Sequence, residues 1–543
     1  MIKLKKPLIP LILASVLFIF FAFKKDYFEV AKQIEIYTSL FKELNMYYID
    51  DTNPAKLTDN ALKHMLKDLD PYTKFYDEQG VEEAKINSSG EYSGIGALTK
   101  KVEGKLKVVE IYEGLPADDA GLKVGDEILK IDNIEIKNIE KNDVSSLIKG
   151  AEGTEINLEI LRQNKKYSYQ IVRKKVEMNP VPHYQMIDDE IGYISFIKFN
   201  KKASGSVKSA YKVLKSQGMQ KLILDMRGNP GGLLNEAVNI TNFFISKDEV
   251  VVTTKAKLQK WSETYKTKNE PIDLEIPLVV LIDGYSASAA EIVAGSLQDL
   301  DRAVIVGERS FGKGLVQRYR DLPYGTKLKL TISKYYTPSG RNIQELDYTN
   351  RKDDMIPKFS DNARNAFKTK NGRTVYDGGG IEPDIIIEKP ETTIATKALY
   401  KSELIFDFAT DYYYQHKTIA KPQDFIFTEK DYQSFLSYVN NNSSSFQTKT
   451  ERIFELGIES AEQEDYKTDI QSQYSDLLHR FAEEKMKDLS VNKEGISEHI
   501  SDEILSRYYF KKGEYINHIY HGKYIMEATK ILNNDQKYNQ ILK

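Results

Sequence analysis

The sequence predicts a multidomain α/β protein. An N-terminal membrane segment and a helical segment precede a mostly β domain, an α/β core and a C-terminal helical region. Three observations predict this. The chain has 543 residues, which at about 150 residues per domain suggests three or four domains. Strand-like and helix-like stretches alternate over residues 176–387, as in an α/β core. One uncharged run, residues 7–23, has lysines on both sides.

The uncharged run predicts an anchor in residues 1–25. As a helix it spans roughly 25 Å, the short end of a membrane crossing. A cleavable signal peptide has the same layout, but bulky Phe20, Phe21 and Phe23 crowd the place where a small-residue cleavage site belongs. The sequence therefore favours an uncleaved anchor and leaves the signal peptide open. The expected location is the cell envelope: anchored in the inner membrane facing the periplasm, or secreted to the periplasm after cleavage.

Composition excludes several classes of protein. The 77 Lys and Arg residues nearly balance 80 Asp and Glu residues, for a net charge of −3, which excludes a generically basic nucleic-acid binder. A hydrophobic content of 41% argues against an acidic disordered chain. The absence of cysteine excludes disulfides, thiolate metal sites, iron–sulfur clusters and a cysteine nucleophile.

The regions follow in order. Residues 26–90 have helical spacing, clearest over 60–69, where Asp70-Pro71 then stops the pattern. Residues 91–174 show short strands with a short helix ended by Gly121. Residues 391–543 are helical and polar, with a flexible linker at 440–445.

The core, residues 175–390, has the clearest elements. The expected strands are 191–197, 221–225, 278–282, 303–306 and 328–335, and the expected helices are 204–217, 235–245 and 289–300.

A serine stands where one of these strands leads into a helix. In Gly284-Tyr-Ser-Ala-Ser-Ala-Ala-Glu291, small residues present Ser288 at the start of the helix. The positive potential there favours the oxyanion formed when a hydroxyl attacks a carbonyl. The alternative is a capping box, in which Ser288 and Glu291 merely begin the helix. The two roles can coexist.

A lysine follows in a second glycine-rich segment, Gly307-Glu-Arg-Ser-Phe-Gly-Lys-Gly314. The segment is similar to a phosphate-binding loop, but that motif needs Ser or Thr at position 314 and a helix next, whereas residues 315–319 have a strand pattern. Nucleotide binding is therefore disfavoured. A partly shielded Lys313 loses its charge readily and can act as a general base. A solvated turn lysine is the alternative.

A third segment, Asp225-Met-Arg-Gly-Asn-Pro-Gly-Gly232, follows an apolar strand. Consecutive glycines there can aim backbone N–H groups at an anion or carbonyl, although a tight structural turn is equally compatible. None of the seven histidines lies near these segments in sequence, and His518 and His521 have no ligand cluster beside them.

Together, in this order, the three segments resemble the carboxy-terminal processing proteases, also called tail-specific proteases. The resemblance covers about residues 47–388 and implies a protease core of the ClpP/crotonase-like type. It implies that Ser288 is the nucleophile, that Lys313 is the base, 25 residues on (313 − 288), and that Gln317 orients the lysine. One departure is Ala290, where the family often has a serine that is not catalytic.

The resemblance also implies the remaining parts of the mechanism. The oxyanion hole falls on the N–H of Ala289 and on one from Gly231 or Gly232. No cofactor and no metal is expected. The implied activity is that of a serine endopeptidase, which cleaves envelope or exported proteins near their C-termini through an acyl-enzyme.

The mostly β domain, residues 91–174, is similar to a PDZ domain. The resemblance places the binding of a peptide's terminal carboxylate on Gly94, Ile95 and Gly96, with the peptide added as a strand at the sheet edge. The expected partners are polypeptides with apolar C-terminal tails, the membrane, and a homo-oligomer or an adaptor protein. A non-catalytic PDZ scaffold that binds protein C-termini is the alternative function.

Overall fold

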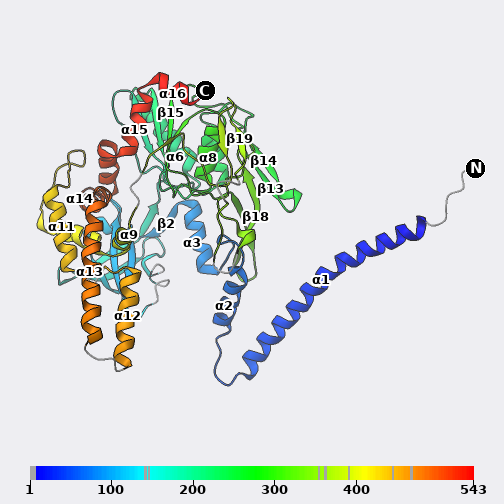
Figure 1. Ribbon diagram of the computed structural model, residues 1–543, viewed down its shortest axis with the longest axis horizontal. Coiled ribbons are helices and arrows are strands. Elements are labelled where there is room, and N and C mark those ends of the chain that lie inside the picture. Colours follow the sequence, from blue (N-terminus) through cyan, green and yellow to red (C-terminus); the bar gives the residue numbers. More distant parts are fainter. Residues whose placement is uncertain are drawn as a thin grey trace, which may run out of the picture. The chain divides into compact units, whose positions relative to one another are not determined.

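A computed structural model describes residues 8–139, 144, 147–351, 355–359, 364–388, 392–442, 446–464 and 469–543, without the side chains of residues 8–26. The chain forms two compact units. The first contains residues 1–77 and 319–331, and the second contains residues 78–318 and 332–543. Figure 1 shows the helices and strands of both units, coloured along the sequence.

The first unit contains α1 (Leu8–Tyr47), α2 (Pro54–Lys67) and β1 (Lys74–Tyr76), as well as the beginning of β18 (Lys327–Tyr336). The Asp70 carboxylate accepts the N–H groups of Tyr72 at 2.9 Å and Thr73 at 3.0 Å, and the Thr331 hydroxyl at 2.9 Å. α2 ends at Lys67, slightly before the stop expected at Asp70-Pro71, and these two residues lead into β1, a strand that the sequence pattern does not predict.

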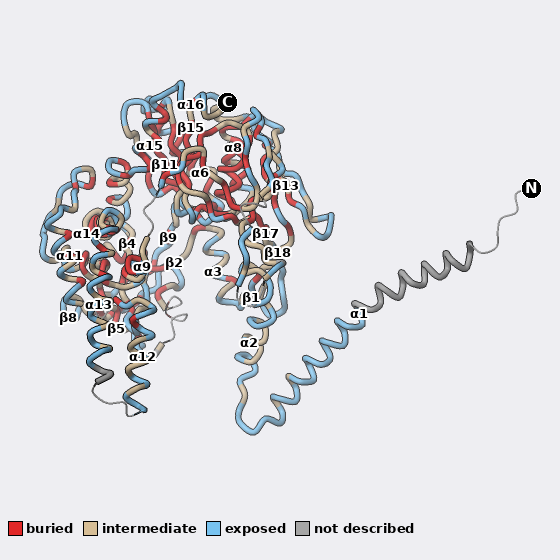
Figure 2. The backbone as a smooth tube through the Cα atoms, viewed as in Figure 1, coloured by how far each residue is buried: buried red, intermediate tan, exposed pale blue. Residues whose placement is uncertain are grey.

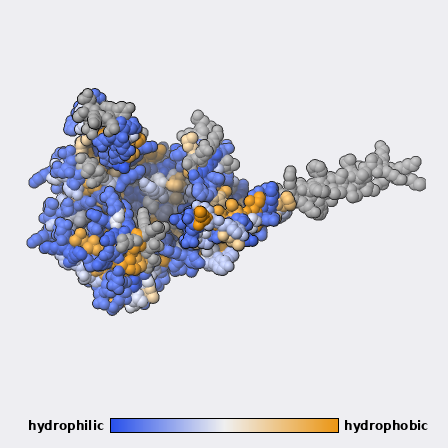
Figure 3. All heavy atoms as spheres, turned by 90° about the horizontal axis from the view of Figure 1, so that it is seen from below, coloured by the Kyte–Doolittle hydropathy of each residue, from blue (hydrophilic) through white to orange (hydrophobic). Residues whose placement is uncertain are grey.

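The expected anchor, residues 1–25, falls on residues outside the description and on the undescribed side chains of α1. Among the helices that are described, none has both the length and the apolar character needed to cross a membrane. Beyond residue 26, α1 leaves many large apolar side chains in contact with solvent, including Tyr27, Val30, Ile34 and Leu40. Figure 3 shows orange, hydrophobic patches next to the grey residues.

The second unit begins with α3 (Glu78–Ser89), followed by the β domain. The sheet of this domain has the order β3-β4-β5-β7-β8, with β6 paired to β5, and β2 pairs separately with β9. The strands are β2 (Glu91–Gly94), β3 (Ala97–Val102), β4 (Lys105–Ile111), β5 (Glu127–Ile131), β6 (Ile134–Glu135), β7 (Glu155–Arg162), β8 (Lys165–Val172) and β9 (Lys174–Glu177). The short helix α4 (Pro116–Asp119) ends just before Gly121, close to its expected position.

A six-stranded sheet forms the core, in the order β10-β11-β12-β15-β16-β21. Its strands are β10 (His183–Met186), β11 (Ile191–Ser195), β12 (Lys221–Asp225), β15 (Leu278–Ile282), β16 (Val304–Gly307) and β21 (Ile385–Ile386). The four middle strands are those expected from the sequence, and they run parallel to one another. The helices between them are α6 (Ala203–Ser216), α7 (Leu234–Thr241) and α8 (Ala289–Asp299).

A second sheet lies beside this core. Strands β13 (Val250–Ala256) and β14 (Glu263–Lys266) pair antiparallel, and β13 also pairs with the end of β18. β17 (Leu315–Asp321) pairs with β18, and a hairpin of β19 (Ala366–Lys368) and β20 (Thr374–Tyr376) follows.

The C-terminal region is helical, as expected. Its helices are α9 (Ile394–Lys401), α10 (Leu404–Gln415), α11 (Glu429–Asn441), α12 (Lys449–Gln463), α13 (Asp469–Val491), α14 (Lys493–His521), α15 (Lys523–Leu532) and α16 (Asp535–Ile541). The linker expected at 440–445 is wrong at its start, because α11 extends through Asn441, and residues 443–445 lie outside the description.

This C-terminal region does not form a separate body within the second unit. In α14 the backbone breaks at Phe510 (φ 54°, ψ −167°), and the Phe510 side chain packs against the buried core of the β domain. α15 and α16 pack on the core sheet. The helices that follow the expected boundary at residue 391 therefore share hydrophobic cores with the β domain and with the core sheet that precede it. Figure 2 shows the buried backbone concentrated in the core sheet and its helices.

Candidate functional site

Three loops, each following a core strand, meet at the start of α8. We call them the glycine turn (residues 226–232, after β12), the serine loop (residues 283–288, after β15) and the lysine loop (residues 308–314, after β16). Parallel strands end at the same edge of a sheet, where ligand sites of α/β proteins form. The three segments selected from the sequence are therefore brought together by the topology.

Ser288 ends the serine loop and directly precedes α8. Its backbone has φ 56° and ψ −111°, a conformation that non-glycine residues rarely adopt. Strained backbone of this kind concentrates at functional sites. The Ser288 N–H donates to Oε2 of Glu291 at 2.7 Å, which is the half of the expected capping box that ties the backbone down.

Glu291 does much more than cap the helix. Its Oε2 also accepts the N–H of Lys313 at 2.9 Å, and its Oε1 accepts the Gly312 N–H at 2.7 Å and the Ser310 hydroxyl at 2.6 Å. The side chain is fully buried. Burial raises the pKa of the Glu291 carboxyl, and the four hydrogen bonds oppose that rise. One carboxylate thus holds the backbone of both Ser288 and Lys313.

The glycine turn is bonded to the serine loop at three points. The Ala287 N–H donates to the carbonyl of Asn229 at 3.0 Å, and the Ser286 hydroxyl donates to the carbonyl of Met226 at 2.8 Å. The Gly228 N–H donates to Oδ1 of Asp283 at 2.9 Å. The turn is therefore held against the residues that immediately precede Ser288.

Within this turn, Gly231 approaches Ser288 so closely that no side chain fits. A Cβ atom at Gly231 would lie 2.5 Å from the carbonyl oxygen of Ala287 and 2.8 Å from the N atom of Ala289. The Gly231 N–H donates to Oδ1 of Asn229 at 2.9 Å. Gly232 sits beside Phe199, with which it forms an isolated bridge. The two glycines that sequence spacing leaves equivalent thus differ in the structure: Gly231 is the one next to Ser288.

Lys313 and Gln317 lie on the third loop and the strand after it, and both side chains are half-buried. The Phe311 N–H donates to the carbonyl of Ser286 at 3.0 Å, which joins the lysine loop to the serine loop. Strand β17 begins at Leu315, where a phosphate-binding loop would continue as a helix. The loop therefore presents a lysine between two strands.

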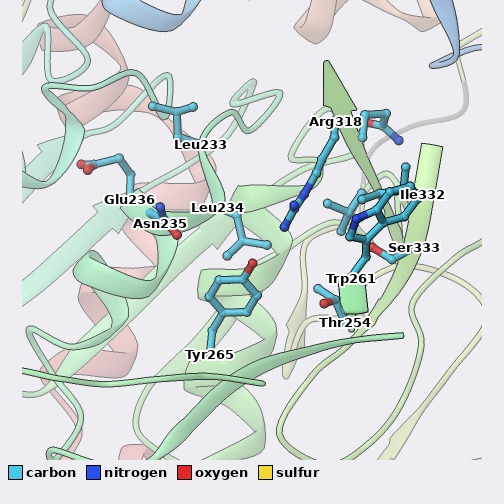
Figure 4. Close-up of a pocket in the computed structure, with 12 residues that line it drawn as sticks. Leu233, Leu234, Asn235, Glu236, Thr254, Trp261, Tyr265, Arg318, Ile332 and Ser333 are labelled. Carbon is cyan, nitrogen blue, oxygen red and sulfur yellow. The ribbon is translucent and has the colours of Figure 1, made fainter. Parts of the chain in front are cut away.

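A pocket of about 330 Å³ opens beside Gln317. Apolar and aromatic side chains line much of it, and the lining residues are Leu233, Leu234, Asn235, Glu236, Thr254, Trp261, Tyr265, Val316, Gln317, Arg318, Ile332 and Ser333. Figure 4 shows Leu234, Tyr265 and Arg318 converging, with Trp261 and Ile332 opposite them. A partly apolar concavity that includes the candidate site residue Gln317 has the character of a side-chain binding site.

The candidate carboxylate loop of the β domain precedes strand β3. The carbonyl of Ile95 accepts the Ala117 N–H at 2.7 Å, and that of Gly96 accepts the Tyr112 N–H at 3.0 Å. Gly96 has φ 75°, and a Cβ there would lie 2.4 Å from the Leu115 Cβ. Gly94 ends β2 just before this loop. Among the described strands, β3 pairs only with β4, so its other edge is open to an added strand.

The described residues contain no group of three or more His, Cys, Asp or Glu side chains arranged to hold a metal ion. His518 instead contacts Asp502, whose Oδ2 lies 2.9 Å from its Nε2.

The sequence predicts only a helix-capping role for Glu291. Its spacing from Ser288 was visible, but its contacts to the lysine loop depend on strand order.

Comparison with known proteins gives three family matches. Peptidase family S41 matches residues 190–350, a PDZ domain matches residues 107–162, and the family described as "Probable PDZ-protease, C-terminal helical domain" matches residues 395–532. The matched segments correspond to the core, the β domain and the C-terminal helices.

Curated relatives carry matching names. A carboxy-terminal-processing protease of Bartonella bacilliformis is 35% identical over 324 residues, which cover 59% of this chain and 74% of the relative. A probable CtpA-like serine protease of Staphylococcus haemolyticus is 34% identical over 326 residues, which cover 59% of this chain and 64% of that relative.

Two solved structures are similar to parts of the chain. The photosystem II D1 C-terminal processing protease is 26% identical, with a TM-score of 0.37, and the match covers 65% of this chain and 86% of that one. The PDZ domain of a carboxy-terminal protease from Vibrio cholerae, solved in complex with a peptide, is 27% identical, with a TM-score of 0.15, over 16% of this chain and 98% of that one.

Proposed function

The chain belongs to the carboxy-terminal-processing proteases, serine peptidases of family S41, and on this premise we propose that Ser288 and Lys313 form its catalytic dyad. The observation that carries the proposal is the Glu291 carboxylate, whose Oε2 accepts the backbone N–H groups of Ser288 and Lys313 at 2.7 and 2.9 Å. A nucleophile and its base must be held in fixed mutual geometry, and a shared backbone anchor supplies this.

In the proposed reaction, the neutral amine of Lys313 takes the proton of the Ser288 hydroxyl as Oγ attacks the scissile carbonyl carbon. The resulting ammonium passes its proton to the leaving amine while the C–N bond breaks, which leaves an acyl-enzyme. Lys313 then deprotonates a water molecule that attacks the ester, and the proton returns to Ser288. Gln317, on β17, orients the lysine amine.

The oxyanion is stabilised by the N–H of Ala289 together with one N–H of the Gly231-Gly232 pair. Ala289 is the first residue of α8, so its N–H lies where the helix dipole favours negative charge. The close approach of Gly231 to Ser288 supports this turn as the second donor. The Gly231 N–H donates to the side chain of Asn229, so it has to leave that hydrogen bond to serve the oxyanion. The alternative donor is the N–H of Gly232, the next residue of the turn.

The substrates we propose are polypeptides with apolar C-terminal tails. The open edge of β3 and the loop at Gly94, Ile95 and Gly96 support capture of a free C-terminus by strand addition. The pocket lined by Leu234, Trp261 and Tyr265 supports acceptance of an apolar side chain near the cleaved bond. The lysine-bracketed run at residues 7–23 supports an envelope location with an N-terminal anchor.

The decisive test compares two serine-to-alanine changes, one at the start of α8 and one within it. Ser288→Ala should lower kcat by at least about 10³-fold. Ser296→Ala, within α8, removes a buried hydroxyl that donates to the carbonyl of Val251 in β13, and it should leave kcat within about threefold. Cleavage of an unstructured peptide with an alanine–valine tail is measured for both. Equal activity of Ser288→Ala and wild type would exclude Ser288 as the nucleophile. Absence of cleavage by the wild-type chain would favour the scaffold function.

Lys313→Arg tests the base. A guanidinium stays protonated at neutral pH, so kcat should fall about as far as in Ser288→Ala, and the double variant should be hardly worse than either single one. An active arginine variant would remove the lysine from the base role.

Tail recognition has its own test. Amidation of the peptide's C-terminus removes its charge and should weaken capture by about 1.5–3 kcal/mol, the range for hydrogen bonds to a charged group. Gly96→Val is a poor substitute for this experiment because the new side chain would collide with Leu115 inside the domain. Equal KM values for the free-acid and amidated peptides would contradict tail recognition and leave the dyad untouched.

A further inference from the structure

The first residues of α15 reach the edge of the core sheet from the side opposite α8. Tyr524 is 7% exposed and packs in the hydrophobic cluster that covers this side of the sheet. The Arg227 guanidinium lies over its ring, with Cζ 4.6 Å from the ring centroid. The Tyr524 hydroxyl hydrogen-bonds to Glu308. One C-terminal side chain therefore touches both the glycine turn and the lysine loop.

Arg227 connects Tyr524 to the strand that carries the glycine turn. Its Nη2 donates to Oδ2 of Asp225 at 2.6 Å, and its Nε lies 3.0 Å from Oδ1 of the same carboxylate. Asp225 is 5% exposed and also accepts the Tyr193 hydroxyl at 2.8 Å. Because a guanidinium is planar, the two contacts fix its orientation as well as its position.

From Arg227 the contacts lead directly to the proposed catalytic atoms. Asn229, two residues on, holds the Ala287 N–H through its carbonyl, and Gly231 lies against Ser288. On the other side, the Glu308 N–H donates to the carbonyl of Ile282, the last residue of β15, at 3.1 Å. Tyr524 thus contacts the first part of the glycine turn and the first part of the lysine loop. The later parts of these two loops carry Gly231 and Lys313.

We propose that Tyr524 is a positioning residue for proteolysis: the C-terminal helix α15 holds the glycine turn and the lysine loop in their productive arrangement. The inference rests on the proposed dyad and adds a requirement to it, since a site assembled from residues 225–317 alone lacks this contact. The stacking face of the ring matters most, because it holds the charged Arg227 at the turn. The hydroxyl matters less, because its partner Glu308 is also tied to β15 by its own backbone.

The physical consequence concerns kcat. A displacement of the glycine turn by about 1 Å misplaces the oxyanion donors and can cost roughly 100-fold in rate. Substrate capture by the β domain and the pocket does not involve Tyr524, so KM should change little. A purely structural role would lower stability without this division between kcat and KM.

The test compares Tyr524 with Tyr538, an equally buried tyrosine of the same hydrophobic cluster. Tyr538 is also 7% exposed, but its hydroxyl bonds to the backbone of Leu278, away from the three loops. Tyr524→Leu, Tyr524→Phe and Tyr538→Leu are assayed in the full-length chain with the alanine–valine peptide, below the lowest unfolding temperature of the three. Ser288→Ala serves as the reference for the dyad itself.

Tyr524→Leu should lower kcat about 10- to 100-fold with KM within about threefold, whereas Tyr524→Phe, which keeps the ring, should retain kcat within about threefold. Tyr538→Leu should lower the unfolding temperature and keep wild-type kcat. Wild-type kcat in Tyr524→Leu, or an equal loss in Tyr538→Leu, would overturn the proposal. An active Ser288→Ala would instead refute the dyad, and this result is read independently of the tyrosine variants.

Discussion

The two faces of the six-stranded core sheet are covered by helices of different origin. On one face, alternate strand residues such as Leu224 and Val280 pack against α6, α7 and α8, which lie between the strands in the sequence. On the other face, the intervening residues such as Ile223 and Val279 pack against α15 and α16, from the end of the chain. The period of two in a strand produces this division.

The two faces differ in how far the candidate site depends on distant parts of the sequence. The face covered by α6–α8 carries Ser288 and Glu291, and its connections are the short crossovers of an α/β fold. The face covered by α15 and α16 is completed only when the last helices dock. The site is therefore built from one face, and Tyr524 braces it from the other.

The largest effects should come from placing the same charge on either face. Ala294 in α8 and Ala528 in α15 are both fully buried. Ala294→Asp and Ala528→Asp should each cost about 3–5 kcal/mol, as expected for an uncompensated buried charge. Ala294→Asp should unfold the core, whereas Ala528→Asp should release α15 and α16 first, because they follow the last strand of the sheet.

Hydrogen exchange distinguishes these outcomes. In Ala528→Asp, the amides of α15 and α16 should exchange faster while those of α8 and β15 stay protected. Ala528→Gly, which removes only a methyl group, is the matched control. If α8 loses its protection together with α15 in Ala528→Asp, the two faces form one cooperative unit and the comparison fails.

A somewhat smaller effect is expected from Glu291→Gln, on the face of the sheet that α6–α8 cover. The amide replaces one of the two oxygens with an NH₂ group, which then faces donors of Ser310 and Gly312 or of Ser288 and Lys313. Two buried donors lose their acceptor, so the free energy of unfolding should fall by about 2–4 kcal/mol. Peptide cleavage should be lost as well, because both backbones shift.

Urea unfolding and kcat are measured together for this variant. Gln298→Glu is unsuitable as a control because Gln298 contacts Arg341, so Gln433→Glu on the exposed surface of α11 serves instead. A Glu291→Gln variant with wild-type kcat would contradict the role of this carboxylate in holding the dyad.

The smallest effect is a dependence of stability on pH, and it arises from buried groups of α14. Burial raises the pKa of Glu514 in α14 to about 7 from an ordinary value of 4.5, although Lys511 opposes the rise. Between these values the folded chain holds a proton that the unfolded chain releases. The free energy of unfolding should therefore fall as pH rises from about 4.5 to 7, by roughly 2–3 kcal/mol.

His518 extends the same trend. Burial lowers the pKa of its imidazole, but the neighbouring Asp502 outweighs burial and leaves it above the ordinary value of 6.5. Its contribution to stability is therefore lost as pH rises above 6.5. Urea midpoints across this range should flatten in Glu514→Gln. An unchanged slope in that variant would assign the pH dependence to other groups.

The sequence alone predicted a large part of the core. The strands at 221–225 and 278–282 were placed to the residue, because continuous apolar runs bounded by turn residues are typical of buried parallel strands. The three segments around Ser288, Lys313 and Gly231 were recognised by composition and order. Strand β1 was missed because three residues beside a helix carry too little pattern.

Which groups share a hydrogen-bond partner depends on how the strands are arranged in the fold. Ser288 and Lys313 could be selected from the sequence, but their common acceptor Glu291 emerged only once β15 and β16 lay side by side. Tyr524 has no local signal at all, since a tyrosine at the start of an amphipathic helix is ordinary. Its place beside Arg227 follows from the docking of α15 on the sheet. Local periodicity determines which face of an element is apolar, while the choice between distant apolar faces depends on how well they pack together.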